Sequence, residues 1–388
     1  MSKQVLILGG GFAGVESAIY LRKKGLNVTL VSDRDYLFIY PISIWIPVSK
    51  MKFEDATIPL EKLAKKHKFE LIIDKVQRIS AKDNSVELGT QKLSYDYLVV
   101  ALGGGKLQHK GSENFMSICG QPDQSVKMKE KFDTLLAKGS GKIAIGYGGN
   151  PKDKTGVRGG PAFEILFNFL DVLKKKGIRD QYDITFFATM KDLGKRMGKS
   201  GYSMLGKMFE KEGINSRTGK KIKEFLPDKV VFEDDSVLET DYTMFIPGGT
   251  GHPILDNSDL PLSDSGFVKI DNHSQVEGFE NVYAIGDVAK VEGPDWVAKQ
   301  GHIAEVMAKN TAYNISEQIK GSSKRKGYSD HLNILCVMDT GNGAAFTYRK
   351  DEKDFIIPLP IVGHWLKKGW GFYYKNSKLN RIPRIPGM

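Results

Sequence analysis

Near its start the chain reads Val5-Leu6-Ile7-Leu8-Gly9-Gly10-Gly11-Phe12-Ala13-Gly14. The four apolar residues predict a strand that is buried on both faces, as in a parallel sheet. Gly9, Gly11 and Gly14 then have the G-x-G-x-x-G spacing, which gives a tight turn, a close approach of backbone to a pyrophosphate, and close packing of helix on strand. The first amides of the following helix, residues 13–24, would hold the phosphates. The stretch indicates a dinucleotide site; a glycine turn in an ordinary α/β domain is the alternative.

Length and composition describe a folded protein of about two or three domains. The chain has 388 residues, 40% of them hydrophobic and 27% charged, and a net charge of +11. Such a charge could attract nucleic acid, an anionic membrane or anionic substrates. The lysines are scattered and no nucleic-acid motif is present, so a solvated surface explains the charge, and we expect no nucleic-acid partner.

Cysteine and histidine usage argues against a disulfide scaffold and against a metal site. The chain has two cysteines, Cys119 and Cys336, and its seven histidines show no paired ligand spacing. The first residues enter a strand at once, without a signal peptide, and no apolar run reaches the length of about 18 residues that spans a membrane. We expect a cytoplasmic protein, with peripheral attachment to a membrane left open.

The second strand of the first unit, residues 27–31, ends in polar residues. A Rossmann unit usually places an acid here to bind the ribose hydroxyls. Ser32 stands at that position with Asp33 beside it, and either side chain can bind a hydroxyl. The aromatic stretch 36–41 follows and ends at Pro41. It would pack over a flavin ring or form a hydrophobic loop under the domain.

A second apolar strand, residues 95–100, also ends in small residues: Ala101, Leu102 and Gly103. In flavoproteins with two dinucleotide domains, a turn like Ala-Thr-Gly at this place brings the chain close to FAD. Leu102 replaces the threonine here.

The third such turn is Gly286-Asp287, after the buried strand 281–285. The carboxylate at this position accepts hydrogen bonds from the ribityl hydroxyls of FAD. A long helix over residues 300–319 begins close by, next to Lys299 and Gly301. Its dipole would point at the pyrimidine edge of the flavin, where reduced flavin carries negative charge. The three turns together predict FAD as the cofactor.

A second unit of the same kind begins at the strand 142–145, with Gly146, Gly148 and Gly149. Residues 150–158 then intervene before a helix that starts near Pro161. In a nicotinamide site the glycines and the helix N-terminus must be adjacent, so that amides and dipole meet at one pyrophosphate. The next strand, residues 183–187, is not followed by a ribose-binding acid. We predict a second Rossmann-like domain that has lost its nicotinamide dinucleotide site.

The C-terminal part predicts three strands, around 332–338, 346–348 and 355–359, and then an aromatic and basic tail. Aromatic rings interleaved with lysines suit a membrane interface, and a terminal helix that packs on the body or on a second copy is the alternative. The tail residues are Trp365, Leu366, Trp370, Phe372, Tyr373 and Tyr374, with Lys367, Lys368 and Lys375.

The predicted fold class is α/β, with two Rossmann-like domains of the FAD/NAD(P)-binding type and a C-terminal strand-and-helix segment. We expect the FAD domain to comprise residues 1–110 and 248–330 and the second domain residues 111–247. The C-terminal segment, residues 331–388, would face the membrane and a quinone.

From Gln4 to about Tyr374 the chain resembles the sulfide:quinone oxidoreductase family. These are FAD proteins related to flavocytochrome c sulfide dehydrogenase and type II NADH dehydrogenase. The two cysteine-bearing stretches and the Gly-Pro-x-x-Glu stretch are more specific than the FAD motifs, which many flavoproteins share. The matching stretches are 9–14, 35–41, 95–104, 117–119, 160–164, 283–287 and 335–337.

The resemblance implies that electrons pass from sulfide, through a cysteine bridge beside the isoalloxazine, to FAD and then to a quinone. This chemistry needs two sulfur atoms, one to carry sulfur and one to attack the flavin. The residues then expected to contact FAD are Gly9, Gly11, Phe12, Ala13, Gly14, Ser32, Asp33, Pro41, Ala101, Leu102, Gly103, Gly286, Asp287 and Gly301.

One redox cysteine of the family pattern is missing. The family places it three residues before the proline of Gly-Pro-x-x-Glu, where this chain has Arg158. Cys336 matches its partner, and Cys119 matches an additional family cysteine. Either these two form a rearranged bridge, or sulfide oxidation is impaired or replaced by another reaction. A family histidine would lie near residues 193–196, where lysine and arginine stand instead.

Four residues are candidates for catalysis. Cys336 and Cys119 are the expected redox thiols, and Cys336 could instead be a small buried residue. Glu164 would shuttle protons for the sulfur site, although the helix dipole alone favours a carboxylate there. Lys299 would support reduced flavin or protonate quinone, or be a solvated residue at a helix start.

Three functions remain open from the sequence. The first is a membrane-associated enzyme of the sulfide:quinone type. The second is a type II NADH:quinone oxidoreductase, against which the interrupted glycine loop argues. The third is an FAD-binding relative with altered or no sulfide activity, which Arg158 favours. The sequence leaves the quinone, the attachment of FAD and the oligomeric state open, a homo-oligomer included.

Overall fold

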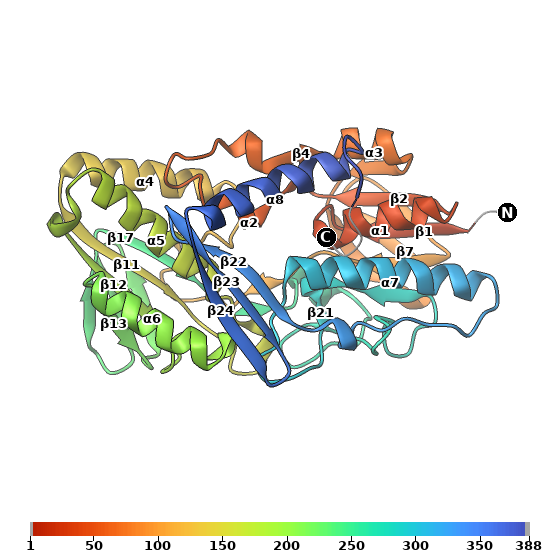
Figure 1. Ribbon diagram of the computed structural model, residues 1–388. Coiled ribbons are helices and arrows are strands. Elements are labelled where there is room, and N and C mark those ends of the chain that lie inside the picture. Colours follow the sequence, from red (N-terminus) through yellow and green to blue (C-terminus); the bar gives the residue numbers. More distant parts are fainter. Residues whose placement is uncertain (1–2, 385–388) are drawn as a thin grey trace.

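The computed structural model describes residues 3–384 and has the predicted α/β architecture. Two parallel sheets form the cores of two Rossmann-like domains, and a C-terminal segment lies across both (Figure 1). The sheet of the first domain has the order β20-β9-β1-β2-β5. Its strands are β20 (Val282–Ala284), β9 (Tyr97–Val100), β1 (Gln4–Leu8), β2 (Asn27–Ser32) and β5 (Glu70–Ile73).

The pairing in this sheet brings the three predicted turns to one edge. β1 lies between β2 and β9, and β9 pairs with β20, all in parallel, so the strands end together. Parallel strands that end together place the following turns at the same edge of the sheet, where α/β proteins bind ligands. Strand β20 is far away in sequence, so the first domain is built from two separate stretches of the chain. The helices on this domain are α1 (Phe12–Lys23), α3 (Leu60–His67) and α7 (Gly301–Ile319).

The second domain repeats the arrangement with a four-stranded parallel sheet and an aromatic core. Phe163 of helix α5 (Gly160–Lys175) stacks on Phe186 of strand β12 (Tyr182–Ala188), with 4.7 Å between ring centroids. The strand order is β13 (Asn215–Thr218), β12 (Tyr182–Ala188), β11 (Gly141–Tyr147) and β17 (Tyr242–Ile246). The helices are α4 (Gln124–Lys138), α5 (Gly160–Lys175) and α6 (Lys199–Lys211).

Smaller antiparallel sheets and short pairs connect these elements. They are β6 (Val76–Ser80) with β7 (Ser85–Leu88) and β8 (Lys92–Ser94); β14 (Ile222–Leu226) with β15 (Lys229–Phe232) and β16 (Val237–Glu239); β10 (Gly105–Lys106) with β18 (Gly249–Thr250); and β19 (Val268–Lys269) with β21 (Ala289–Lys290).

The aromatic stretch 36–41 is more regular than the predicted loop. It forms strand β3 (Tyr36–Phe38), which pairs antiparallel with β4 (Thr57–Pro59), and then the short helix α2 (Tyr40–Ser43), with Pro41 in its first turn. The stretch takes this form because Leu37, Phe38 and Ile39 are all buried in the core.

The C-terminal segment consists of three antiparallel strands and one long helix. The strands are β22 (Ile334–Asp339), β23 (Gly343–Lys350) and β24 (Lys353–Pro360), and the helix is α8 (Val362–Lys378). In Figure 1, α8 runs across the top of the molecule from the second domain toward the first. Two glycines let it pack closely: a Cβ on Gly363 would lie 2.5 Å from the Cβ of Ala344, and one on Gly371 would lie 2.8 Å from Ile42.

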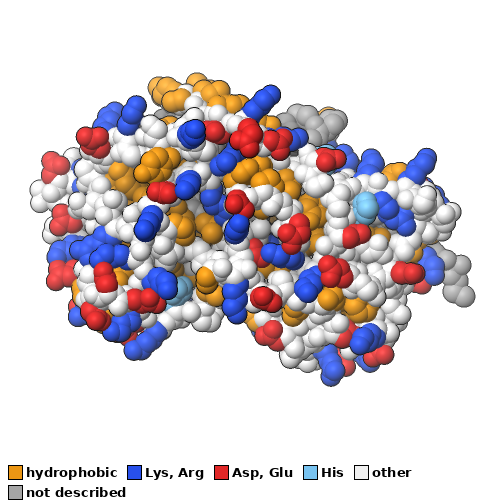
Figure 2. Space-filling view, turned by 90° about the horizontal axis from the view of Figure 1, so that it is seen from below, with side chains coloured by type: hydrophobic (Ala, Val, Ile, Leu, Met, Phe, Trp, Pro, Cys, Tyr) orange, Lys and Arg blue, Asp and Glu red, His pale blue; other side chains and the backbone are white. Residues whose placement is uncertain are grey.

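The inner and outer faces of α8 differ strongly. Trp365, Leu366 and Phe372 are exposed, whereas Lys367 and Lys378 are buried. The expectation that Lys367 stands with the aromatic residues at an outer surface is therefore wrong, because this lysine turns inward to pair with a buried carboxylate. Among the described residues no helix is long and apolar enough to cross a bilayer. On the face seen in Figure 2, basic and acidic side chains are interspersed.

Candidate active site

The first glycine turn combines tight packing with an open cradle. Gly9 has φ +113°, and a Cβ there would lie 2.3 Å from the carbonyl oxygen of Ala101. A Cβ on Gly14 would lie 1.8 Å from the carbonyl oxygen of Gly9. By contrast, a Cβ on Gly11 would meet no atom within 4 Å. Open space at the N-terminus of α1 fits a pyrophosphate bound by backbone amides.

The other predicted turns converge on the same place. A Cβ on Gly286, which has φ +71°, would lie 3.2 Å from the Cβ of Ala13. One on Gly301, at the start of α7, would lie 3.4 Å from the ring of Phe12. Gly103 has φ +78° with free space beside it, and Leu102 is half-buried next to it. The structure thus brings the N-termini of α1 and α7 together with the turns after β9 and β20, as an FAD site requires.

At the ribose end, Ser32 is buried and Asp33 is exposed. The hydroxyl of Ser32 donates to the carbonyl oxygen of Arg34 at 2.7 Å, so its own proton is already used. The sequence analysis missed Arg34, whose Nη1 is buried without a hydrogen-bond partner. A basic residue two positions after the end of β2 was the available signal. A polar or anionic group of the cofactor can satisfy this guanidinium.

Asp287 lies within a group of cations. Arg158 forms an ion pair with it, and Lys106 and Lys299 also act on it electrostatically. Burial by itself raises the pKa of Asp287, but these three cations hold the pKa below its usual value. Asp287 in turn raises the pKa of the Arg158 guanidinium. The residue at the missing cysteine position therefore acts on the carboxylate that we expect to bind the ribityl chain.

Lys299 is half-buried near Asp287 and is not a freely solvated residue. Its ammonium group donates to the carbonyl oxygen of Ala289 and lies 3.9 Å from the ring centroid of Phe267. Burial lowers the pKa of Lys299 to about 8, against the opposing effect of Asp287. A lysine with this pKa can gain or lose a proton near neutral pH.

Cys336 lies on β22, opposite Thr347 of β23, at the junction of the C-terminal segment with the second domain. Burial raises the pKa of this thiol to about 12; Glu164 raises it further and Lys367 opposes the rise. Glu164 is buried in the first turns of α5, and Lys367 of α8 forms an ion pair with it. Burial raises the pKa of Glu164 too, and Lys367 opposes that shift. The predicted proton shuttle thus lies beside the predicted redox thiol.

Cys119 has different neighbours. It interacts electrostatically with Arg158, Lys106 and Tyr40, and the Tyr40 hydroxyl donates to the carbonyl oxygen of Gly120 at 3.0 Å. Both cysteines are free thiols in the structure. The cationic group around Asp287 thus acts electrostatically on one thiol, and Glu164 and Lys367 act on the other.

The interrupted glycine loop of the second domain packs onto the first. Asn150 donates to the carbonyl oxygen of Gly249 at 2.8 Å, and Lys290 bonds to Asp153 at 2.9 Å. The segment therefore stands between the end of β11 and the start of α5. Within residues 3–384, no three histidine, cysteine or carboxylate side chains are grouped to hold a metal ion.

Comparisons with known proteins show the family of this chain. Residues 3–308 match the family model described as "Pyridine nucleotide-disulphide oxidoreductase". Fold and site together define an FAD-dependent oxidoreductase of this family, to which the chain belongs. Within it, the chain belongs to the sulfide:quinone oxidoreductase family, because it is 30% identical to the sulfide-quinone reductase of Aquifex aeolicus (strain VF5) over 97% of this chain and 89% of that protein.

Solved structures and a further relative share the fold or the sequence pattern of this chain. The X-ray structure of the Aquifex aeolicus sulfide:quinone oxidoreductase superposes with a TM-score of 0.87 at 25% identity, covering 98% of this chain and 92% of that one. A type II NADH:quinone oxidoreductase of Staphylococcus epidermidis is 22% identical over 90% of each protein. NDH2 of Plasmodium falciparum in complex with NADH, at 15% identity and a TM-score of 0.73, shares the fold.

Proposed function

We propose that this enzyme transfers two electrons from a sulfide-type donor, through Cys336 and FAD, to a quinone. The observation that carries the proposal is the position of Cys336, with a buried carboxylate and a buried lysine acting on its thiol at the junction of α5, β22 and α8. The similarity to a sulfide-quinone reductase over nearly the whole chain supports the choice of donor and acceptor.

FAD would supply the two-electron redox chemistry that links the sulfide-type donor to the quinone. The residues of the chain orient it and manage protons around it. The turns at Gly11 and Gly286 provide backbone amides and space for it, and Asp287 offers a carboxylate for its ribityl hydroxyls. Glu164 accepts the proton that the Cys336 thiol must lose before it can act as a nucleophile.

Arg158 changes the sulfur side of the reaction relative to the family. Only one family redox thiol, Cys336, remains in its place, and Cys119 lies among different neighbours. The guanidinium adds a positive charge beside Cys119 and Asp287. Such a positive charge attracts an anionic donor. Hydrosulfide and larger sulfur anions are both negatively charged and would be attracted in this way.

The membrane-facing surface in this proposal is the outer face of α8. Trp365, Leu366 and Phe372 are exposed to 64%, 51% and 68%, and Ile361 and Val362 extend the patch. Residues 365 and 372 are seven positions apart and so lie on one side of the helix. Exposed aromatic and aliphatic side chains on an amphipathic helix suit peripheral attachment to a bilayer, from which a lipid-soluble quinone enters.

The test is anaerobic titration of the purified yellow holoenzyme with sulfide, followed by a short-chain quinone. We expect sulfide to bleach the visible flavin band and quinone to restore it. Cys336→Ser should lose the bleaching, and it is compared with Cys119→Ser, which removes the other thiol. An unbleached flavin in the wild type refutes the sulfide donor. Bleaching by NADH instead identifies the type II NADH:quinone reaction, and inertness to both identifies an FAD-binding relative without either activity.

A further inference from the structure

The segment between β11 and α5 of the second domain is anchored on the first domain. Asn150 donates to the carbonyl oxygen of Gly249 at 2.8 Å, and Asp153 pairs with Lys290 at 2.9 Å. The segment cannot leave the first domain without breaking these contacts. Its last residue, Arg158, is therefore held against the domain that contains the FAD turns.

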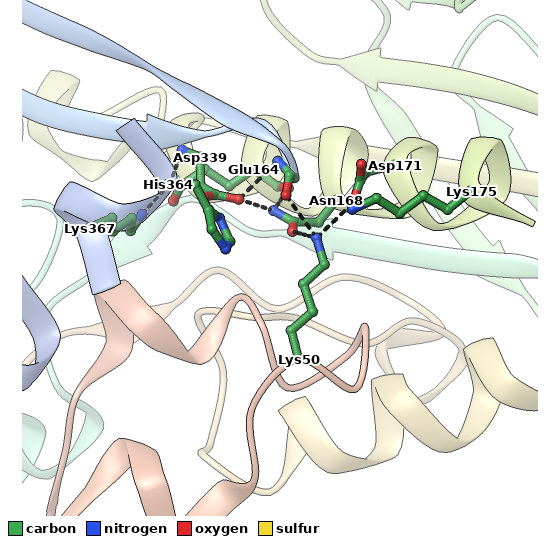
Figure 3. Close-up of polar contacts among 9 residues, drawn as sticks. Lys50, Glu164, Asn168, Asp171, Lys175, Asp339, His364 and Lys367 are labelled. Atoms are coloured by element: carbon green, nitrogen blue, oxygen red, sulfur yellow. Dashed lines mark hydrogen bonds and ion pairs between the residues drawn. The ribbon is translucent and has the colours of Figure 1, made fainter. Parts of the chain in front are cut away.

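The other end of this segment is held by α5, which begins two residues after Arg158. Figure 3 shows the polar contacts that fix α5 to the C-terminal segment. Glu164 of α5 forms an ion pair with Lys367 of α8, and Asn168 donates to Asp339 of β22 at 2.9 Å. All four side chains are buried, so water does not compete for these bonds. The backbone next to Arg158 is thus fixed from both sides.

Arg158 forms its ion pair with Asp287 at the point where the turns of the first domain meet. The bond runs from Nη2 of the guanidinium to Oδ2 of the carboxylate. Asp287 follows Gly286, where a Cβ would lie 3.2 Å from the Cβ of Ala13 at the start of α1. A Cβ on Gly104, after β9, would lie 3.7 Å from the Cβ of Asp287. A residue of the second domain therefore reaches into the predicted FAD site.

We propose that Arg158 is a positioning residue for FAD: through its ion pair with Asp287 it keeps this carboxylate ionised and fixed for the ribityl hydroxyls of the cofactor. The ion pair uses Oδ2, and the second oxygen, Oδ1, can accept from a hydroxyl. An ionised carboxylate accepts a stronger hydrogen bond than a neutral one. The arginine at the position of the missing cysteine thus has a role toward the cofactor that a thiol cannot fill.

Three cations act on Asp287, each from a different part of the fold. Arg158 comes from the segment before α5, Lys106 from β10, and Lys299 from the residues before α7. Burial raises the pKa of Asp287, and Arg158, which contacts the carboxylate directly, has the largest opposing effect. Without Arg158 the burial is opposed only by the two lysines, so the carboxyl group takes up a proton at a higher pH.

The inference rests on the proposed function in one respect, the binding of the ribityl chain by Asp287. Sulfide, quinone and Cys336 do not enter it. Its test therefore measures how tightly the protein holds FAD, and this readout is independent of turnover.

The experiment dilutes the purified holoenzyme and measures the FAD that it releases by flavin fluorescence, at several values between about pH 5.5 and pH 8. We expect a nearly constant Kd for the wild type, because Asp287 stays ionised. Arg158→Met should raise the Kd about tenfold or more at the acid end and less at the alkaline end, since it weakens a hydrogen bond to a charged group. Arg158→Lys keeps the positive charge and should restore the flat profile. Lys154→Met is the matched control, because Lys154 lies in the same segment and pairs with Asp295 at the exposed surface.

A double-mutant cycle with Asp287→Asn separates this role from a loss of packing. If Arg158 acts through Asp287, Arg158→Met should change the Kd no more than about twofold in the Asp287→Asn protein. The same large change in both backgrounds overturns the proposal, and so does a Kd that Arg158→Met leaves unchanged or raises equally at every pH. If Arg158→Met does not fold, Arg158→Gln, which keeps polar contacts without the charge, takes its place in the cycle.

The two proposals fail separately. A flavin that sulfide does not bleach refutes the sulfide donor and leaves these Kd values as they are. Conversely, a Kd that does not depend on Arg158 overturns the present inference and leaves the sulfide reaction standing.

Discussion

Gly11 and Gly14 belong to one motif but have different physical requirements, and substitution can separate them. A Cβ on Gly14 would collide with the carbonyl oxygen of Gly9 at 1.8 Å, whereas a Cβ on Gly11 meets no protein atom within 4 Å. We expect Gly14→Ala to destabilise the fold by about 3 kcal/mol or more, because backbone must move. Gly11→Ala should keep the stability of the apoprotein and lose FAD affinity.

The measurement for this pair is thermal unfolding of the apoproteins together with the ratio of flavin absorbance to protein absorbance after purification. Gly206→Ala on α6 provides a control for adding a methyl group to an exposed helical glycine, since nothing lies within 4 Å of its Cβ position and its φ is not positive. If Gly11→Ala binds FAD like the wild type, the pyrophosphate does not lie at this cradle.

Lys299 predicts a pH dependence of the flavin. Its pKa is lowered to about 8, mainly by burial. Below this pH the ammonium group is charged and stabilises negative charge on reduced flavin; above it the charge and the stabilisation are lost. We expect the midpoint potential of bound FAD to show an inflection near pH 8. Lys299→Met should remove the inflection and lower the potential at pH 7 by about 30 mV, equal to about 1.4 kcal/mol for two electrons.

The check is a spectroelectrochemical titration of the holoenzyme at several pH values. Lys309→Met is the control, because Lys309 is exposed on α7 and is not among the groups that act on Lys299. A potential that follows the same pH curve in the wild type and in Lys299→Met shows that this ammonium group does not act on the flavin.

The end of α8 is held on the first domain by a buried charge cluster. Lys378 pairs with Glu16 of α1 and Glu305 of α7, and Arg384 also pairs with Glu16. Burial raises the pKa of Glu16 on its own, but Lys378 and Arg384 hold it below its usual value. Tyr374 of α8 also stacks on Phe12, with 4.9 Å between ring centroids. The C-terminal helix is therefore fixed directly to the two helices that begin at the flavin site.

Removal of Lys378, the central cation of this cluster, should lower the free energy of unfolding. Lys378→Met leaves two carboxylates buried near each other with less compensation, and breaking a buried pair costs about 3 to 5 kcal/mol. We expect a clear fall in Tm at pH 7 by circular dichroism and a smaller fall at acid pH, where the carboxylates take up protons. Lys320→Met is the control, since Lys320 is exposed and pairs with Glu317 on the surface. Equal Tm values for the two variants would contradict a stabilising role for Lys378.

The sequence predicted those elements whose signals are local. The turns after β1, β9 and β20 follow from strand patterns and adjacent small residues, and the start of α7 at Gly301 lies within one residue of the prediction. The form of residues 36–41 was missed because burial of Leu37 and Phe38 depends on pairing with the distant strand β4.

The ion pairs of the site could not be predicted, because their members are far apart in sequence. Glu164 and Lys367 are separated by 203 positions, and Arg158 and Asp287 by 129. A lone lysine in an aromatic tail is typical of a solvated or lipid-facing residue. Only the fold of α8 onto α5 turns Lys367 inward. The sequence also gave no signal for the charge cluster at Lys378, because Glu16 and Glu305 are far from Lys378 in the sequence.

The two domains and the C-terminal segment form one molecule in which α8 spans both. Its inner face contacts the sulfur junction through Lys367 and the first domain through Lys378, while its outer face carries the exposed apolar side chains. A protein attached to a bilayer through this face would hold its sulfur junction and its flavin site at fixed depth relative to the lipid. Membrane attachment and electron transfer would then depend on the same helix.

Attachment can be tested with substitutions that leave the interior intact. Trp365 and Phe372 are mostly exposed, so Trp365→Glu and Phe372→Glu should not change Tm. Each removes an aromatic side chain from the lipid interface and adds a negative charge, and we expect binding to vesicles of anionic phospholipid to weaken about tenfold or more. Co-sedimentation at low and high salt gives the measurement. Tyr202→Glu on α6, where the ring is 52% exposed, is the control. Vesicle binding that is unchanged by both substitutions in α8, or equally reduced by the control, would show that the outer face of this helix is not the site of attachment.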